Sequence, residues 1–308
     1  MVPYGYDDKM GGFHMDDMHT VFVYGTLRRH ERYHHLLQGA VLVAAQAKTR
    51  GELYDTGLGY PAMVVRDEGW VYGEVYRVTN EQLARLDELE GYKPGHPDSE
   101  YHRIQVSVET DQGPVLAYTY VYDERQTSTL TPIRLGDWKA HVMRKQEWLH
   151  YFAYGSAMDN HRLILQGVQS LFRDIVGRGV LSGYSLQFTI RSADGSRADI
   201  VEGQGVVEGK VYRIGQPAVD YLFEREGVYK GRYRPAFVDV ATGDGQEVQA
   251  LTFVVCDKQP EVPPPYWYAE EILRGADGTV SPQYFRKLLT DFREKFHMTF
   301  PHVAEEEA

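Results

Sequence analysis

The sequence predicts an α+β protein built from two similar, mostly β units in tandem. Two observations support this prediction: a short motif occurs twice, and each copy is followed by strand-like segments in the same order. The first copy reads Val23-Tyr-Gly-Thr-Leu27 and the second reads Ala153-Tyr-Gly-Ser-Ala157, each at the end of a short apolar run. A pattern that recurs within one chain is typical of a duplicated fold.

A second pair of segments keeps the same spacing. Gly209 lies 136 residues after Gly73, each in a Gly-x-Val-Tyr-Arg segment, and Glu226 lies 136 residues after Glu90. The constant offset holds one glutamate at a fixed position relative to one strand in both units.

Alternating apolar and polar residues give the order of elements in each unit. In the first unit, strands are expected at 20–24, 41–45, 71–78, 102–108 and 115–121, with a helix-like segment around Leu36 and Leu37. In the second, strands are expected at 151–154, 181–190, 206–214, 234–240 and 248–255, with a helix near 162–166. Two further helical stretches follow Pro265 and Ser281.

These elements define five parts of the chain. A leader at 1–17 and an acidic tail at 301–308 flank the repeat, and neither has a periodic apolar pattern. The first domain is expected at 18–130 and the second at 148–300. A helical bridge at 131–147, part of a helix-compatible stretch from 133 to 149, joins them.

Bulk properties exclude several classes of protein. The formal charge of −11, without a cluster of Lys and Arg, argues against a nucleic-acid partner. No apolar run reaches membrane-spanning length and the N-terminal residues do not resemble a signal peptide, so we expect a soluble, cytoplasmic protein without membrane association. The single cysteine, Cys256, excludes an intrachain disulfide.

The segment before Glu90 predicts a short helix with readable ends. Thr79 and Gln82 form a capping-box pattern at its start, and Gly91 suits the left-handed residue after its end. Leu83 and Leu86 lie seven and four residues before Glu90, which places the glutamate on the apolar, interior stripe.

The second unit repeats this placement with a different sequence. Val219 and Leu222 lie seven and four residues before Glu226, and Gly227 follows. Burial and the negative end of the helix dipole both favour the protonated form of such a carboxyl group. Each glutamate is therefore a candidate general acid/base, although a carboxylate that only braces the neighbouring strand would show the same pattern.

The repeated Tyr-Gly motif supplies a complementary part. Gly25 and Gly155 permit a tight turn between a strand and an expected helix, so that backbone N–H groups at the helix N-terminus point at a ligand. Such a loop suits a carboxylate or an oxyanion. With one interior glutamate in each half, the sequence predicts two sites of the same design.

At these residues the sequence resembles the γ-glutamylcyclotransferase-like family, which includes the γ-glutamylamine cyclotransferases and the plant AIG2-like proteins. The first unit resembles the γ-glutamylamine and AIG2 branch. The residues that carry this resemblance are Tyr24 to Arg28, His34, Tyr60-Pro61, Gly73 to Tyr76, Leu86 to Glu90 and Tyr101 to Arg103. The second unit resembles γ-glutamylcyclotransferase itself. Here they are Phe152 to Ser156, Gly209 to Tyr212, Glu224 to Val228, Pro265-Tyr266 and the helix after Ser281.

The resemblance implies a fold, a site and a reaction. Each domain is expected to be a small mixed β-barrel flanked by short helices, and the whole chain a monomer with an intrachain pseudo-dimer. Glu90 and Glu226 correspond to the family's general acid/base. The residues implied to bind substrate are Tyr24, Gly25, Thr26, Leu27 and Tyr101 in the first unit and Tyr154, Gly155, Ser156, Ala157 and Tyr233 in the second.

The implied reaction is acyl transfer or a lyase-type release within a small γ-glutamyl substrate. Its free α-amine attacks its γ-carbonyl, which releases 5-oxoproline and an amine or amino acid without a metal or organic cofactor. The substrate thus supplies the nucleophile, in keeping with a sequence that has no Gly-x-Ser-x-Gly elbow. The second unit departs from its branch at Ala157-Met158, in place of Asn-Leu, and at Phe223, in place of Asp.

Two further groups of residues, a set of histidines and a pair of glycines, could suggest a metal or nucleotide site. His30, His34 and His35 lie at helical spacing but have no evident acidic partner, which favours a polar surface over a metal site. Gly203-Gln-Gly205 lacks nucleotide-binding spacing and is interpreted as turn glycines. The remaining alternative function is a non-catalytic module that binds a small metabolite or peptide end on the same duplicated fold.

Overall fold

The structure is a computed structural model that describes residues 18–96 and 99–301. The leader predicted at 1–17 and almost all of the acidic tail lie outside the described residues. The chain forms two compact units, the first from the described part of Met1–Thr110 with Pro114–Pro132, the second from Asp111–Gly113 with the described part of Ile133–Ala308. The segment expected as a bridge falls largely within the second unit.

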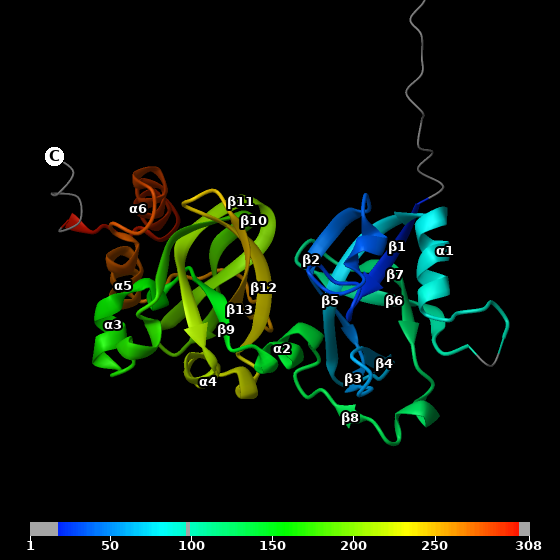
Figure 1. The fold of residues 1–308 in the computed structure, drawn as a ribbon. Coiled ribbons are helices and arrows are strands. Elements are labelled where there is room, and N and C mark those ends of the chain that lie inside the picture. The colour runs from blue at the N-terminus through cyan, green and yellow to red at the C-terminus, as the bar shows by residue number, and fades with distance from the viewer. Residues whose placement is uncertain (1–17, 97–98, 302–308) are drawn as a thin grey trace, which may run out of the picture. The chain divides into compact units, whose positions relative to one another are not determined.

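The first unit is a closed barrel with strand order β1-β5-β2-β6-β7 (Figure 1). Its strands are β1 (Met18–Val23), β2 (Val41–Arg50), β5 (Trp70–Thr79), β6 (His102–Thr110) and β7 (Val115–Val121). The neighbours are antiparallel except β1 and β7, which are parallel and close the barrel. This barrel is the mixed β-barrel that the resemblance implied.

A small second sheet and short helices complete the first unit. The sheet has the order β4-β3-β8, formed by β3 (Glu52–Asp55), β4 (Pro61–Val64) and β8 (Thr131–Pro132). The helical elements are η2 (His34–Leu37), α1 (Asn80–Leu89) and η3 (Glu124–Thr127). The sequence did not predict β3 and β4, because each has only four residues and β4 is buried throughout, without the alternation that marks a strand.

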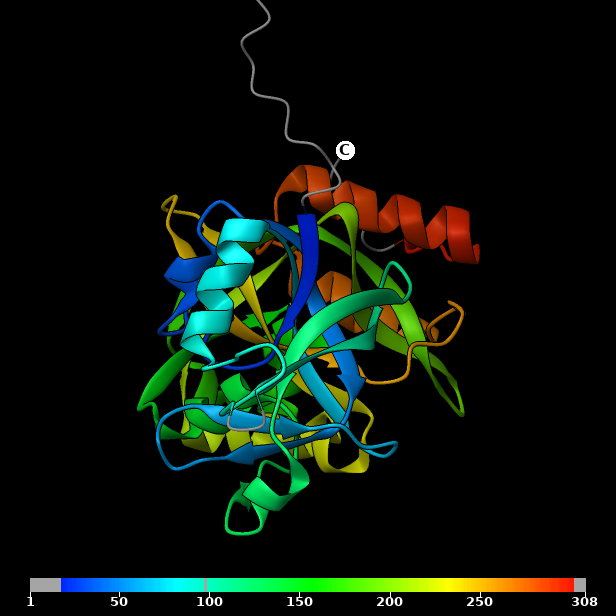
Figure 2. The same cartoon turned by 90° about the vertical axis from the view of Figure 1, so that its right-hand side faces the viewer.

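Helix α1 begins and ends as its sequence predicts. Thr79 accepts a hydrogen bond from the backbone N–H of Gln82, and the Gln82 side chain accepts one from the Thr79 N–H. Gly91 follows with φ of +60°. Figure 2 shows α1, in cyan, alongside β1, in blue, and its buried residues are Leu83 and Leu86.

The second unit repeats the barrel with longer strands, in the order β10-β11-β9-β13-β12. They are β9 (Trp148–Ala153), β10 (Ile175–Ser192), β11 (Gly195–Gly215), β12 (Tyr233–Thr242) and β13 (Glu247–Val255). Again the first and last strands, β9 and β13, pair in parallel to close the barrel. The duplicated fold predicted from the repeated motifs is therefore confirmed.

The second unit has more helices than the first. They are α2 (Trp138–Val142), η4 (Met143–Lys145), η5 (Ser156–Met158), α3 (Asn160–Leu165), η6 (Gln169–Phe172), α4 (Gln216–Arg225), η7 (Val228–Lys230), α5 (Tyr266–Ala276) and α6 (Pro282–Phe296). Helix α4 corresponds to α1. Its residues Val219 and Leu222 are fully buried, and Gly227 follows with φ of +64°.

Two expectations about these elements were wrong. The helix expected over 133–149 is confined to α2 and η4, because Gly136 adopts φ of +62°, Asp137 caps a helix that starts at Trp138, and β9 begins at Trp148. The glycines at 203 and 205 lie inside β11 rather than in a turn. A Cβ atom at Gly205 would lie 2.5 Å from the Tyr184 carbonyl oxygen, so this glycine permits close approach of two strands.

Candidate active sites

In the first unit the repeated motif forms a loop directly after β1. The Tyr24 hydroxyl donates a hydrogen bond to the carbonyl oxygen of Tyr120 on β7, at 2.7 Å. A Cβ atom at Gly25 would lie 2.7 Å from Cγ of Pro61, so only glycine fits here without displacing the neighbouring ring. The loop is thereby held against both β7 and β4.

The loop does not lead into the expected helix. Residues 25–33 form turns, and His30 adopts a left-handed φ of 64° before the short 3-10 helix η2. Buried Glu74 on β5 organises this turn, because its carboxylate accepts from Arg28 Nε at 3.2 Å and from the Arg29 N–H at 2.8 Å. A helix N-terminus therefore does not contribute to the first site.

The backbone N–H groups of the loop remain available for a ligand. Among the described residues, the N–H groups of Gly25, Thr26 and Leu27 have no protein acceptor, whereas the Gly25 and Thr26 carbonyls accept from Arg28 and Tyr33. Three adjacent donors at a cavity wall suit a carboxylate or a developing oxyanion. The chemistry expected of a helix N-terminus is thus supplied by the loop.

Glu90 is the C-terminal cap of α1 and faces the same cavity. Its side chain is partly buried, not fully buried as the helical phase predicted. Burial, reinforced by the nearby charge of Glu100, raises the pKa of Glu90 to about 8. A carboxyl group with this pKa can exchange protons near neutral pH.

The first cavity has a volume of about 140 Å³. Tyr101 donates to the Pro61 carbonyl oxygen at 2.9 Å, and Tyr60 donates to Glu100 Oε1, also at 2.9 Å. Its lining residues are Phe22, Val23, Tyr24, Gly25, Thr26, Leu27, Tyr33, Tyr60, Pro61, Leu89, Glu90, Glu100, Tyr101 and Tyr120. The structure thus brings together all six candidate residues of the first unit.

The second unit repeats this loop with different supports. The Tyr154 hydroxyl donates to the carbonyl oxygen of Phe253 on β13, and Tyr233 donates to the Ala198 carbonyl oxygen at 2.7 Å. Lys210 occupies the position of Glu74 and donates from Nζ to the Met158 carbonyl oxygen at 2.6 Å. Opposite charges at one strand position therefore organise the two loops.

The second loop leads into the 3-10 helix η5 and then α3, so a helical segment does follow it here. In the part of the chain that the structure describes, the N–H groups of Gly155, Ser156 and Ala157 have no protein acceptor. The three adjacent donors of the first loop thus recur at the same place in the second.

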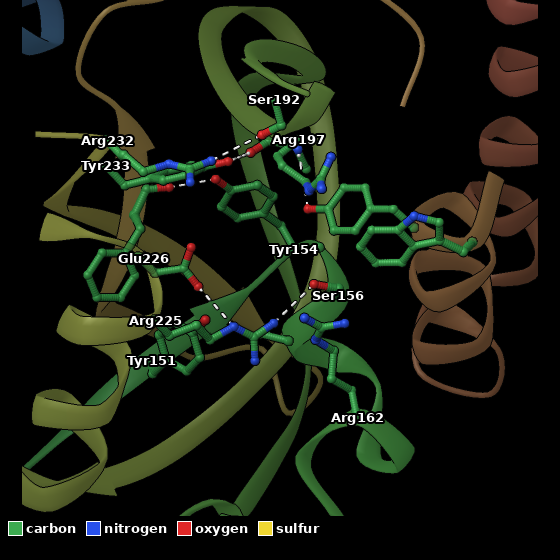
Figure 3. Close-up of a pocket in the computed structure, with 16 residues that line it drawn as sticks. Tyr151, Tyr154, Ser156, Arg162, Ser192, Arg197, Arg225, Glu226, Arg232 and Tyr233 are labelled. Atoms are coloured by element: carbon green, nitrogen blue, oxygen red, sulfur yellow. Dashed lines mark hydrogen bonds and ion pairs between the residues drawn. The ribbon is translucent and has the colours of Figure 1, made fainter. Parts of the chain in front are cut away.

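Glu226 caps α4 as Glu90 caps α1, but its electrostatic surroundings differ. Burial raises the pKa of Glu226, and the guanidinium groups of Arg225, Arg162 and Arg232 oppose that rise. Arg225 Nε lies 3.3 Å from Glu226 Oε1, and Arg225 Nη2 donates to the Ser156 hydroxyl at 3.0 Å. An arginine therefore links the glutamate to the loop (Figure 3).

The second cavity, of about 240 Å³, contains all six candidate residues of its unit. Its lining residues are Tyr151, Tyr154, Gly155, Ser156, Ala157, Arg162, Ser192, Arg197, Ala198, Arg225, Glu226, Arg232, Tyr233, Phe253, Trp267 and Tyr268. Sequence reasoning missed the four arginines. Only Arg225 had a signal, as the residue next to Glu226.

Phe223 replaces a polar network. At the equivalent position of the first unit, Asp87 accepts from Arg103 at 2.6 Å and from the Tyr120 hydroxyl at 2.8 Å. Phe223 instead packs edge-on against Phe253, with ring centroids 5.9 Å apart. The departure noted in the sequence thus changes the support behind the second cavity from hydrogen bonds to aromatic packing.

Comparisons with known proteins agree with the duplicated fold. The family model described as "Gamma-glutamyl cyclotransferase, AIG2-like" matches residues 21–140, and the model described as "AIG2-like family" matches residues 206–289. The Bacillus subtilis protein YkqA is 44% identical over 87% of this chain and 95% of its own length. The chain belongs to the gamma-glutamylcyclotransferase, AIG2-like family. It is a tandem member, with one family domain in each unit.

Solved and single-domain relatives agree with this assignment. The crystal structure of YkqA matches with a TM-score of 0.79 over 88% of this chain and 96% of that chain. The gamma-L-glutamyl-butirosin B gamma-glutamyl cyclotransferase of Niallia circulans is 39% identical over 41% of this chain and 80% of its own length. The gamma-glutamylcyclotransferase of Bos taurus is 30% identical over 45% of this chain and 76% of its own length.

None of the helices in the described ranges, 18–96 and 99–301, combines the length and apolarity needed to cross a bilayer.

Proposed function

We propose that the protein is a γ-glutamyl cyclotransferase that releases 5-oxoproline from γ-glutamyl amines or γ-glutamyl amino acids. The observation that supports this proposal is the same in both units. One glutamate with a raised pKa, Glu90 or Glu226, shares a cavity with a loop whose adjacent N–H groups have no acceptor among the described residues. Membership of the family supports the class of reaction.

In the proposed reaction the glutamate moves one proton. It accepts a proton from the α-ammonium group of the substrate, and the freed amine attacks the γ-carbonyl carbon to form the five-membered lactam. The glutamate returns this proton to the leaving nitrogen as the carbon–nitrogen bond to the leaving group breaks. The attacking nitrogen gives up its second proton as the lactam forms, and that proton ends on the released amine as an ammonium group. The enzyme is thereby regenerated, and no external nucleophile is consumed.

The loop holds and orients the substrate. Its N–H groups are placed to bind the γ-glutamyl carboxylate, and the surrounding tyrosines restrict the bound molecule. Holding the amine and the carbonyl at reacting distance accounts for much of the rate, because ring closure within one molecule gains greatly from orientation.

Product analysis of two separate variants tests the proposal. Wild type, Glu90→Gln and Glu226→Gln are each incubated with γ-glutamyl amines, γ-glutamyl dipeptides and glutathione, and 5-oxoproline is measured by mass spectrometry. Loss of a general acid/base lowers the rate about 10²- to 10⁴-fold, so each variant loses the products of its own cavity. The proposal fails if wild type releases no 5-oxoproline, or if the double variant retains full activity.

A second candidate function applies to the second cavity. The ion pair between Arg225 and Glu226 holds the glutamate as part of an anion-binding surface, which favours a non-catalytic binding module in that unit. Binding of a panel compound without turnover, unaffected by Glu226→Gln, would favour this module.

A further inference from the structure

The second cavity gathers cationic side chains that the proposed reaction does not require. Four of its lining residues are arginines, against one acidic residue, Glu226. The described lining of the first cavity includes Glu90 and Glu100 and neither arginine nor lysine. Leu89 of the first cavity lies 136 residues before Arg225, at the corresponding position. Matching loops and glutamates therefore face differently charged cavities.

Figure 3 shows these arginines as two pairs on either side of Glu226. Arg225 and Arg162 lie toward Ser156 in the loop, and Arg225 donates to its hydroxyl. Arg232 and Arg197 lie at the other end, where Arg232 Nη2 donates to the Ser192 hydroxyl at 3.1 Å. One end of the cavity, at the loop, therefore has Arg225 and Arg162. The other end, beyond Glu226, has Arg232 and Arg197.

The arginines differ in how far their charge is already used. Arg162 binds Glu271 at 2.6 and 2.8 Å, Arg197 binds Asp194 at 2.8 Å, and Arg225 pairs with Glu226. Within the described residues, the side chain of Arg232 has the one hydrogen bond to Ser192 and no carboxylate within ion-pair distance. Since a guanidinium group carries five N–H donors, Arg232 keeps a free edge for a bidentate carboxylate.

Arg197 is held in place by aromatic rings. Its guanidinium carbon lies 5.0 Å from the ring centroid of Trp267 and 5.1 Å from that of Tyr268. These contacts fix a second positive charge at the same end of the cavity as Arg232. The end of the cavity near Ser192 therefore carries two cationic groups, of which Arg197 is also paired with Asp194.

The position of the scissile bond assigns this end to the leaving group. The γ-glutamyl carboxylate takes the loop side, where Arg225 Nη1 is buried without a hydrogen-bond partner among the described residues. The γ-carbonyl must lie within reach of Glu226, which lies between the two arginine pairs. The departing part of the substrate then extends toward Ser192 and Arg232.

We propose that Arg232, with Arg197 at the same end of the cavity, forms an anion subsite for the leaving group. Every leaving amino acid brings one carboxylate of its own, and two arginines at this end leave a place for a second. The second cavity therefore prefers γ-glutamyl compounds whose leaving amino acid also carries an acidic side chain. This inference rests on the proposed cyclotransferase function and adds a substrate class and a specificity-determining residue.

The test compares two substrates of nearly equal shape, γ-glutamylglutamate and γ-glutamylglutamine. Both are assayed with Glu90→Gln, so that only the second cavity turns over. A charge-assisted contact predicts a kcat/KM for the acid about tenfold or more above that for the amide. Adding Arg232→Gln should bring the ratio close to one, and Arg232→Lys should restore part of it. A ratio near or below one before the Arg232 change, or a ratio that Arg232→Gln leaves unchanged, overturns the inference.

Arg191→Gln is the matched control. Arg191 is exposed, lies next to Ser192 on β10 and does not line the cavity. Its substitution by Gln removes the same charge as Arg232→Gln. It should leave the ratio as in its parent. An equal loss of the ratio in this control would attribute the preference to general surface charge and overturn the subsite.

A binding measurement separates this inference from the proposed reaction. If no compound yields 5-oxoproline, the proposed function fails, and the dissociation constants of both compounds are measured by calorimetry on the Glu90→Gln, Glu226→Gln protein. Tighter binding of the acid that disappears with Arg232→Gln supports the subsite without turnover. Equal binding of acid and amide overturns it.

Discussion

At the scale of single residues, the two glutamates occupy equivalent positions in unequal electric fields. Glu90 has the Glu100 carboxylate near it, whereas Glu226 has arginines around it. A neighbouring negative charge disfavours ionisation and a positive charge favours it. The proposed proton transfer is therefore expected to depend on pH differently in the two cavities.

The first cavity should show this in its pH profile. With Glu226→Gln, kcat/KM should rise with pH to a midpoint near 8, because the proton-accepting form of Glu90 is its carboxylate. Adding Glu100→Gln removes the repelling charge and should move the midpoint downward. The midpoint should stay above the ordinary value of 4.5, since burial is the larger cause of the shift.

Glu109→Gln is the control for this measurement, since it removes a charge from an exposed position on β6 outside the cavity. A midpoint that stays the same in Glu100→Gln, or that moves equally in Glu109→Gln, would contradict the assignment of Glu100 as the neighbouring charge.

At the scale of elements, the ends of α1 and α4 position the two glutamates. Gly227 follows Glu226 at φ of +64°, and a Cβ atom there would lie 3.1 Å from Arg232 Cδ. A left-handed backbone disfavours any residue with a Cβ atom by about 1–2 kcal/mol. This glycine therefore couples the end of the helix to the direction of the glutamate.

Gly227→Ala should lower the free energy of unfolding of the second unit by about 1–2 kcal/mol and reduce turnover in its cavity. Urea unfolding followed by tryptophan fluorescence reports on this unit in a Trp70→Phe background, because the other three tryptophans, Trp138, Trp148 and Trp267, all belong to it. Gly243→Ala is the control: its φ is not left-handed, and no atom lies within 4 Å of its Cβ position. Equal losses in the two variants would contradict this account of Gly227.

Many of the helices and strands, and the position of the glutamates on them, could be predicted from the sequence. The ends of α1 follow from Thr79, Gln82 and Gly91, and the register of Glu90 follows from the leucines before it. These signals are local, so the chain displays them directly. The helix expected over 133–149 was too long because its pattern gave no weight to Gly136 or to the strand that starts at Trp148.

The remainder of the site depends on contacts between distant segments. Ser192, Arg197 and Arg232 come from β10, β11 and the turn before β12, and no spacing in the sequence connects them. Glu100 likewise lies outside both repeated motifs. The loop and the glutamate were predictable because duplication repeated them, whereas the residues that make the cavities different are those that duplication did not preserve.

At the scale of the whole molecule, the chain carries two cavities, and each lies in a unit with its own hydrophobic core. Each barrel has its own cluster of buried residues, and each cavity is lined by residues of one unit. Among the described residues that line each cavity, none comes from the other unit. The two activities should therefore be independent.

Independence predicts additive rates. For a mixture of γ-glutamyl compounds, the wild-type rate of 5-oxoproline release should equal the sum of the Glu90→Gln and Glu226→Gln rates within experimental error, because two sites that share no lining residue contribute separately. The measurement is a continuous assay at saturating substrate. A wild-type rate well above or below that sum would show coupling between the units and contradict the prediction.

The tyrosine at the start of each loop links catalysis to the integrity of the barrel. Its hydroxyl spans the parallel seam, from β1 to β7 or from β9 to β13, where few residues pair directly. If the two parallel strands separated, the loop would lose this hydrogen bond and the cavity would lose its wall. If the loop holds the substrate as proposed, binding should oppose that separation, since a ligand that binds only the closed form stabilises it. We therefore expect each barrel to unfold at a higher temperature when its proposed substrate is bound.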